Sequence, residues 1–163
     1  MTARISRDAY GLEVAAAVAR RADCTRRQVG AVIVSPDGSI VATGYNGLSA
    51  GLPGCASAGA CPRGRMAYAE QPASVGYEAT GCRAAHAEVN AVIRAGRDRC
   101  IGATIYVTDE PCFHCSVVIE AAGIARVVTP KTTVIGPGDE ERAAQTGRLE
   151  SPSFPALPGR RNR

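Results

Sequence analysis

The sequence predicts an α/β protein in which helices cover a sheet. Short β-prone runs alternate along the chain with runs whose apolar residues recur at helical spacing. The chain has 163 residues, 45% of them hydrophobic and 21% charged, which suffices for one compact core and leaves little room for a second. Residues 1–163 are therefore expected to form a single domain. Where a helix joins two strands, we expect the strands to pair in parallel.

The first part of the chain predicts one helix and one hairpin. Apolar residues recur at helical spacing over residues 5–22, with Ser6 and Asp8 available to cap the start. Two short β-prone runs follow, at residues 30–35 and 40–45, and the Pro-Asp-Gly-Ser sequence between them is a hairpin turn signal. These two strands are expected to pair with each other.

A long loop separates the hairpin from the remaining elements. Residues 47–81 are rich in Gly, Ala, Pro and Ser and show no sustained helical or strand periodicity, so this long loop requires additional contacts to keep it ordered. The pattern then predicts a helix, a buried strand, a second helix and another strand, at residues 84–95, 103–108, 111–123 and 125–129. Residues 131–163 are expected to form a flexible tail, in which only residues 139–145 favour a helix.

Charge and cysteine usage narrow the functional classes. The net charge is +4, but the arginines are spread along the chain, which does not by itself indicate nucleic-acid binding. Only residues 160–163 are densely basic, as expected of a solvated end. No export signal and no apolar run of membrane-spanning length is present, so we expect a cytoplasmic protein. Its seven cysteines are then metal ligands or free thiols rather than a disulfide framework.

Two cysteines at the start of a predicted helix indicate a metal site. Cys112 and Cys115 are three residues apart on one helical face, where the helix N-terminus favours their thiolate forms. A third ligand should be a histidine, and the chain has two. His86 lies in the first turn of the preceding predicted helix, whereas His114 lies between the cysteines and should project elsewhere. One His and two Cys leave the fourth position of a tetrahedral zinc open for water, as in catalytic sites.

Glu88 is predicted to carry protons. It stands two residues after His86, so its carboxylate diverges from the metal ligand and can face a substrate. His-x-Glu followed by Pro-Cys-x-x-Cys is the signature of zinc-dependent deaminases, in which the metal lowers the pKa of water and one carboxylate acts as base and then as acid. A structural zinc knuckle or a redox-active Cys-x-x-Cys is the alternative, but neither requires a His-x-Glu on an earlier helix.

Residues 8–130 resemble the cytidine and deoxycytidylate deaminase family, most closely its dCMP deaminase branch. The resemblance rests on Pro111-Cys112-x-x-Cys115 and on Cys24-Thr25-Arg26, Val29-Gly30-Ala31-Val32-Ile33-Val34, Gly44-Tyr45-Asn46-Gly47, His86-Ala87-Glu88-Val89-Asn90-Ala91 and Ala122-Gly123-Ile124. It implies a three-layer α/β/α sandwich with a central mixed sheet and the zinc between two helices. It also implies that Asn46 contacts the sugar of the substrate, the Ala87 amide its pyrimidine carbonyl, and Arg26 its phosphate.

The reaction that the resemblance implies is hydrolysis of dCMP to dUMP and ammonia. The implied partners are a small nucleotide, further copies of the chain in a homo-oligomer, and dCTP and dTTP as regulators. Several alternatives stay open. Asn46-Gly47 is also a common turn pair, and Arg26 is also consistent with a surface charge. A Glu at position 110, before Pro111, makes this motif similar to that of deaminases acting on guanine, tRNA adenosine or riboflavin-pathway pyrimidines. CMP and cytidine also stay open as substrates. A non-catalytic zinc-binding module is the alternative from another class.

The resemblance also draws attention to four further cysteines. Cys24, Cys55, Cys61 and Cys82 stand where some members of this branch hold a second, structural zinc. A closed thiolate site would fix the Gly-rich loop, which contains two of them. Their spacing departs from the usual Cys-x-x-Cys pairs, so free thiols are an equal alternative. Cys100 is expected to be buried without a further role.

Overall fold

The structure, a computed structural model, describes residues 3–66 and 80–135. The helix predicted at residues 139–145 and the basic end at residues 160–163 lie outside the described residues, as does most of the tail. A single domain over residues 1–163 and a flexible tail therefore stay predictions.

Five strands form one mixed sheet. Its order is β2 (Ile40–Tyr45), β1 (Gly30–Val34), β3 (Thr104–Val107), β4 (Arg126–Val128) and β5 (Thr133–Ile135). Only β3 and β4 are parallel neighbours; the other three pairs are antiparallel. The expectation that strands joined by a helix pair in parallel is therefore confirmed for β3 and β4 and wrong for β2 and β3, which are not neighbours. The strands β2 and β3, which a helix joins, run in the same direction, but β1 lies between them and its hairpin to β2 makes both of its own pairings antiparallel.

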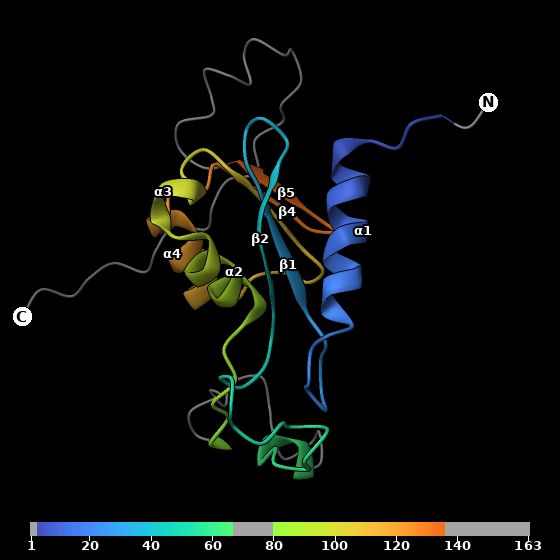
Figure 1. Cartoon of the computed structure of the whole chain (residues 1–163), viewed down its shortest axis with the longest axis vertical. Helices are drawn as coiled ribbons and strands as arrows, with labels where there is room; N and C mark the ends of the chain where they lie inside the picture. Colours follow the sequence, from blue (N-terminus) through green and yellow to red (C-terminus); the bar gives the residue numbers. More distant parts are fainter. Residues whose placement is uncertain (1–2, 67–79, 136–163) are drawn as a thin grey trace, which may run out of the picture.

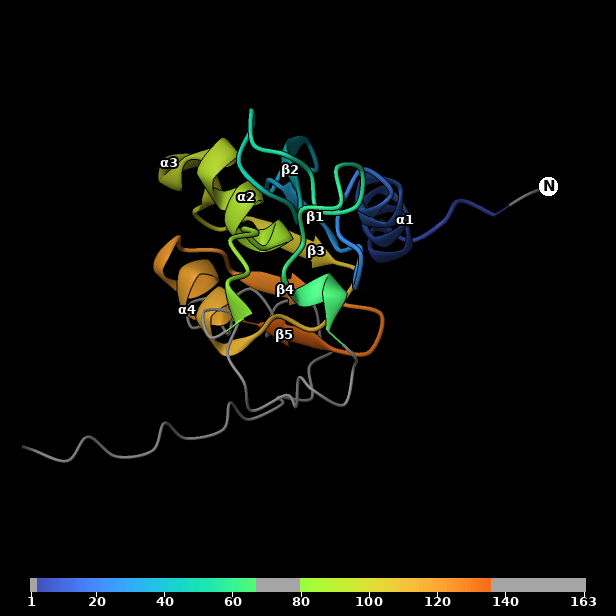
Figure 2. The same cartoon turned by 90° about the horizontal axis from the view of Figure 1, so that it is seen from below.

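Helices cover both faces of this sheet, so the predicted three-layer sandwich is confirmed (Figures 1 and 2). The helix α1 (Arg7–Ala19) packs on one face, and α2 (Ala87–Ala95), α3 (Arg97–Cys100) and α4 (Phe113–Ala121) lie over the other. The predicted helices and strands are confirmed to within three residues at each end. Three short elements are additional: α3, β5 and the single turn η1 (Arg63–Arg65). No helix in the described part of the chain has the length and apolarity needed to cross a membrane.

The alternating side chains of the strands supply two separate cores. Ile33 and Ile105 point to the face covered by α2 and α4. Val32 and Tyr106 point to the opposite face, where they pack with Ala15 of α1. Because both faces are buried, the central strands carry continuous apolar runs instead of an apolar and polar alternation.

Two glycines allow the helices to lie directly on the sheet. A Cβ atom at Gly44 of β2 would overlap the carbonyl oxygen of Ala87 and the amide nitrogen of Ala91 in α2. One at Gly30 of β1 would overlap the backbone of α1 in the same way. The helix backbones therefore approach the strands more closely than any larger residue would permit.

An ion pair ties α1 to β4. The Arg126 guanidinium donates to both carboxylate oxygens of Asp8, at 2.6 and 2.7 Å, and the Tyr106 hydroxyl donates to the same carboxylate at 3.2 Å. The hydrogen bond from Arg126 is the main cause that holds the pKa of Asp8 below its ordinary value, against the opposing effect of burial. The Asp8 side chain remains 40% exposed, so solvent screens part of this interaction.

Asp8→Asn should therefore lower stability in a pH-dependent way. A carboxyl group whose pKa is lower in the folded protein contributes stability above its unfolded pKa, and this contribution is lost as the pH falls through the folded value. At neutral pH the variant should lose about 1 kcal/mol, or about 2–4 °C in melting temperature, and this deficit should shrink below about pH 4. Circular dichroism melts measure it, with Glu13→Gln, an exposed carboxyl on the same helix, as the control. A deficit that stayed constant down to about pH 2 would contradict the ion-pair account.

Candidate metal centre

The start of α2 is fixed by the chain that follows β2. Gly47 and Ala85 form an isolated antiparallel bridge with N···O distances of 3.1 and 3.0 Å. This bridge keeps Ala85 extended, so the helix begins at Ala87 and not at residue 84 as predicted, and His86 is its N-cap. His86 therefore lies immediately before the first turn of α2, and Glu88 lies within that turn.

The segment after β3, which leads to the two cysteines, is held by β1 and by the loop before it. The Thr108 amide donates to the Gly30 carbonyl, and the Gly30 amide donates to the Thr108 hydroxyl, both at 3.0 Å. The Asp109 carboxylate pairs with the Arg27 guanidinium at 2.9 Å. The sequence analysis did not predict these contacts, because about 80 residues separate the partners and no local pattern marks them.

Glu110 braces the same segment from the other side. Its carboxylate accepts hydrogen bonds from the hydroxyls of Thr129 and Thr132, the latter at 2.9 Å, in the turn between β4 and β5. Thr129 is buried, and its hydroxyl oxygen also accepts from the Thr132 amide at 2.9 Å. Glu110, the residue that this chain shares with other deaminases, thus stabilises the segment that precedes Cys112.

These two segments bring His86, Cys112 and Cys115 together. Nδ1 of His86 lies 3.6 Å from the Cys112 sulfur and 3.3 Å from the Cys115 sulfur, and the three ligand atoms lie within 4.8 Å of one another. When a tetrahedral zinc is bound to a nitrogen at about 2.05 Å and to a sulfur at about 2.3 Å, that nitrogen and that sulfur are about 3.6 Å apart. The group therefore fits a zinc ion. The His114 side chain is exposed and stacks edge-on against Phe113.

Glu88 lies beside this group and is buried, with 4% of its surface exposed. Burial, and then the negative charges of Glu88 and Cys112, raise the pKa of the Cys115 thiol. Thiolates and a carboxylate gathered in a buried place repel one another, and a divalent cation offsets that repulsion. The surroundings of Cys115 therefore favour a bound metal with a carboxylate next to it.

Cys24, Cys55, Cys61 and Cys82 lie near one another, although more loosely than the His86 group. Cys55, Cys61 and Cys82 line one cavity of about 210 Å³. Burial raises the pKa of the Cys55 thiol to about 11, with smaller effects from the charges of Cys61, Cys24 and Cys82. Among the described residues, however, only the His86 group brings three ligand atoms within 4.8 Å. The sulfur atoms of these four cysteines are thus farther apart than the ligand atoms of the His86 group.

Asn46 is bound by the protein itself. Its Oδ1 accepts from the Val29 amide and its Nδ2 donates to the Arg27 carbonyl, both at 2.8 Å. An amide side chain has two donor hydrogens and two acceptor lone pairs, so one of each is left for a substrate. Asn46 therefore fixes the loop before β1, whatever else it binds.

Arg26 and Ala87 have different surroundings. Arg26 is half-buried, and Nη1 donates to the carbonyls of Arg63 and Met66 at 3.4 and 3.5 Å. Ala87 is fully buried as the first residue of α2, and its N-cap His86 makes no side-chain capping hydrogen bond. The first amides of a helix have no acceptor within the helix, so this end of α2 suits a carbonyl oxygen.

Comparison with known proteins identifies the family. The model of the cytidine and deoxycytidylate deaminase zinc-binding region matches residues 5–131. The chain belongs to this family. The deoxycytidylate deaminase of Mycobacterium phage D29 is 48% identical over 124 residues, which are 76% of this chain and 94% of that protein. The deoxycytidylate deaminase of Schizosaccharomyces pombe is 42% identical over 127 residues, which are 77% of this chain and 37% of that protein.

Solved structures of this deaminase family share the fold. The ligand-free dCMP deaminase of cyanophage S-TIM5 aligns with a TM-score of 0.55 over 89% of this chain and 95% of that chain, at 22% identity. The same enzyme with dCMP and dUMP aligns with a TM-score of 0.53 over 77% of this chain and 83% of that chain, at 24% identity. This likeness confirms the cytidine deaminase fold. Zinc is the metal of the family, and His86, Cys112 and Cys115 form the group of residues that fits it.

The two histidines of the chain provide a matched test of the metal site. His86→Ala removes one of three ligands and should release this zinc during dialysis against a chelator, whereas His114→Ala should retain it, because that ring is exposed outside the group. Metal analysis of the dialysed proteins gives the comparison. Equal zinc loss from both variants would refute the assignment of His86.

Proposed function

We propose that the protein hydrolyses dCMP to dUMP and ammonia. The observation that carries the proposal is the zinc-fitting group of His86, Cys112 and Cys115 with the buried Glu88 beside it. It occurs in a chain that is 48% identical to one deoxycytidylate deaminase over almost the whole length of that enzyme. The relatives support the choice of dCMP as substrate, and the zinc-fitting group with Glu88 supports hydrolytic deamination as the reaction.

Glu88 moves the protons of this reaction. Zinc, when bound by the three ligands, supplies a water molecule that is acidic enough to be used near neutral pH. Glu88 takes a proton from the water and delivers it to the ring nitrogen N3, which makes C4 open to attack by the water oxygen. Glu88 then passes the second proton to the amino group as the C4–N bond breaks. One water enters, ammonia leaves, and a carbonyl replaces the amine.

The substrate is oriented by residues at the same end of the sheet. The Ala87 amide, in the first turn of α2, donates to the pyrimidine carbonyl. Asn46 uses its remaining amide donor and acceptor for the sugar, while its other two hydrogen bonds hold the loop of Arg27 and Val29. Arg26 reaches the phosphate from the neighbouring loop, where the Arg63 and Met66 carbonyls orient its guanidinium.

Glu88→Gln should abolish turnover while leaving zinc in place. The amide keeps the size of the side chain but cannot accept and release protons, so kcat for dCMP should fall by at least about a hundredfold. Glu120→Gln, an exposed glutamate on α4, is the control and should keep full activity. Deamination is followed by absorbance and ammonia release, with zinc measured in each sample. Full activity of Glu88→Gln would refute the proton-transfer role.

The same assay tests the choice of substrate. The wild type is offered dCMP, CMP, deoxycytidine, cytidine, guanine, a riboflavin-pathway pyrimidine and a tRNA anticodon stem, and dCMP should give the highest kcat/KM. Preference for another base would overturn the dCMP assignment and retain the deaminase chemistry. Stoichiometric zinc without turnover of any base would identify a non-catalytic module.

Cys24, Cys55, Cys61 and Cys82 form a second, structural zinc site in this proposal. The proposal is supported by the place of Cys55, Cys61 and Cys82 around one cavity, by the electrostatic effect of Cys24 on Cys55, and by the need of a Gly-rich segment for a fixed point. A small inward movement of the loop on metal binding would close the four thiolates around the ion.

Zinc counts should separate the two sites. The wild type should bind two zinc ions per chain, His86→Ala and Cys55→Ser one each, and the double variant none. Cys55→Ser should also lower the melting temperature, because it frees the loop. A single zinc in the wild type that is lost in His86→Ala would leave the four cysteines as free thiols.

The protein is further proposed to act in the cytoplasm as a homo-oligomer. Reduced cysteines, which zinc thiolates require, are maintained there. Apolar side chains on the outer surfaces of α2 and α4 support self-association: Ile93 is 71% exposed and Phe113 63%. Regulation by dCTP and dTTP remains an expectation from the family resemblance.

A further inference from the structure

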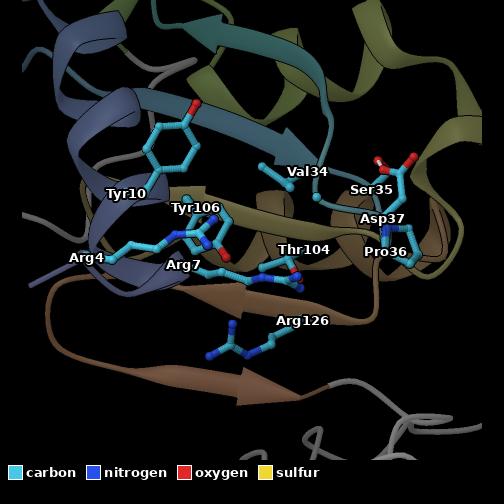
Figure 3. A pocket seen from close by; sticks show the side chains of 11 residues that line it. Arg4, Arg7, Tyr10, Val34, Ser35, Pro36, Asp37, Thr104, Tyr106 and Arg126 are labelled. Atoms are coloured by element: carbon cyan, nitrogen blue, oxygen red, sulfur yellow. Dashed lines mark hydrogen bonds between the residues drawn. The ribbon is translucent and has the colours of Figure 1, made fainter.

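A cavity of about 320 Å³ lies on the face of the sheet that α1 covers, away from the metal centre (Figure 3). It is bounded by the start of α1, by the turn between β1 and β2, and by the first residue of β3 and of β4. None of the metal-centre residues lines it. The deamination chemistry therefore gives this cavity no role.

The cavity is cationic. Arg4, Arg7 and Arg126 all line it, and Figure 3 shows their side chains on the side of the cavity that faces away from the turn of Asp37. The charge of Arg126 is balanced by Asp8 through two hydrogen bonds. Arg4 and Arg7 form no ion pair with any described residue. Their two positive charges therefore stay available to an anion.

The acidic residue of the cavity does not neutralise them. Asp37 lies across the cavity on the hairpin turn (Figure 3), where its carboxylate accepts hydrogen bonds from the Ser35 hydroxyl and from the Ser39 amide, the latter at 2.9 Å. The start of α1 adds positive potential on the side of the arginines, because helix N-termini carry a partial positive charge. The field near Arg4 and Arg7 thus favours an anionic group.

The remaining walls suit an attached ring. Tyr10 is 46% exposed, and its ring and the Val34 side chain line the same cavity as Arg4 and Arg7. A cavity of this volume is at the lower end of the range for small-ligand sites. Arginine forks recognise phosphate oxygens through paired hydrogen bonds, and tyrosine rings stack on planar bases.

We propose that this cavity binds a phosphate-bearing ligand of nucleotide size, with its phosphates between Arg4 and Arg7 and its ring against Tyr10. The site is separate from the metal centre and does not require that the protein deaminates dCMP.

Binding to the full-length zinc-loaded protein tests this site. Inorganic pyrophosphate, ATP and adenosine are titrated by calorimetry without magnesium. A purine nucleotide is used because a pyrimidine nucleotide would also enter the proposed catalytic site. Arg4→Ser/Arg7→Ser should weaken pyrophosphate and ATP by about tenfold or more. Arg20→Ser/Arg21→Ser, which removes the same charge at the opposite end of α1, should leave both affinities unchanged.

Tyr10 separates the phosphate from the ring. Tyr10→Ala should weaken ATP and leave pyrophosphate unchanged, and adenosine, which has no phosphate, should bind about tenfold or more weakly than ATP. Equal pyrophosphate affinity in the two double-arginine variants would overturn the proposal, and so would adenosine binding as tightly as ATP. Turnover of dCMP is measured in parallel: binding through Arg4 and Arg7 by a protein that does not deaminate would refute the proposed function and leave the cavity site standing.

Discussion

The direct contact between the backbones of α2 and β2 at Gly44 determines the position of the histidine in the zinc-fitting group. Gly44 meets the Ala87 carbonyl and the Ala91 amide with no side chain between them. Ala87 stands between His86 and Glu88, so the depth of this contact fixes the zinc-fitting histidine and the buried carboxylate together. A larger residue at position 44 would lift the start of α2 off the sheet and move both side chains away from the cysteines.

The other half of the centre depends on β1, the strand that both halves share. Gly30 pairs with Tyr45 at the end of β2 on one side and exchanges hydrogen bonds with Thr108 after β3 on the other. Gly30 of β1 therefore holds both the segment that leads to His86 and the segment that leads to Cys112. Glu110 then links the second segment to the turn before β5, so the whole width of the sheet sets the distance between the imidazole and the thiols.

This dependence explains which parts of the site could be predicted from sequence. His86, Cys112 and Cys115 stand in short sequence patterns, and the fold brings their ligand atoms within 4.8 Å of one another, so the local patterns were sufficient to select this group. The role of Glu88 stays a prediction. The start of α2 was placed three residues too early because the bridge between Gly47 and Ala85 is non-local. The braces at Asp109 and Glu110 could not be predicted, since their partners are distant in the chain. The order of the strands also had no local signal: β1 lies between the two strands that α2 joins, and only the folded sheet reveals this.

The two faces of the sheet carry separate hydrophobic cores. Alternation along β3 sends Ile105 to the metal face and Tyr106 to the α1 face, and each face closes its own core of small aliphatic side chains. A low aromatic content keeps both layers thin, so the helices lie on the strands through glycine and alanine. The charged groups Arg4 and Arg7 lie on the α1 side of the sheet, outside the hydrophobic core that supports the zinc-fitting group on the other face.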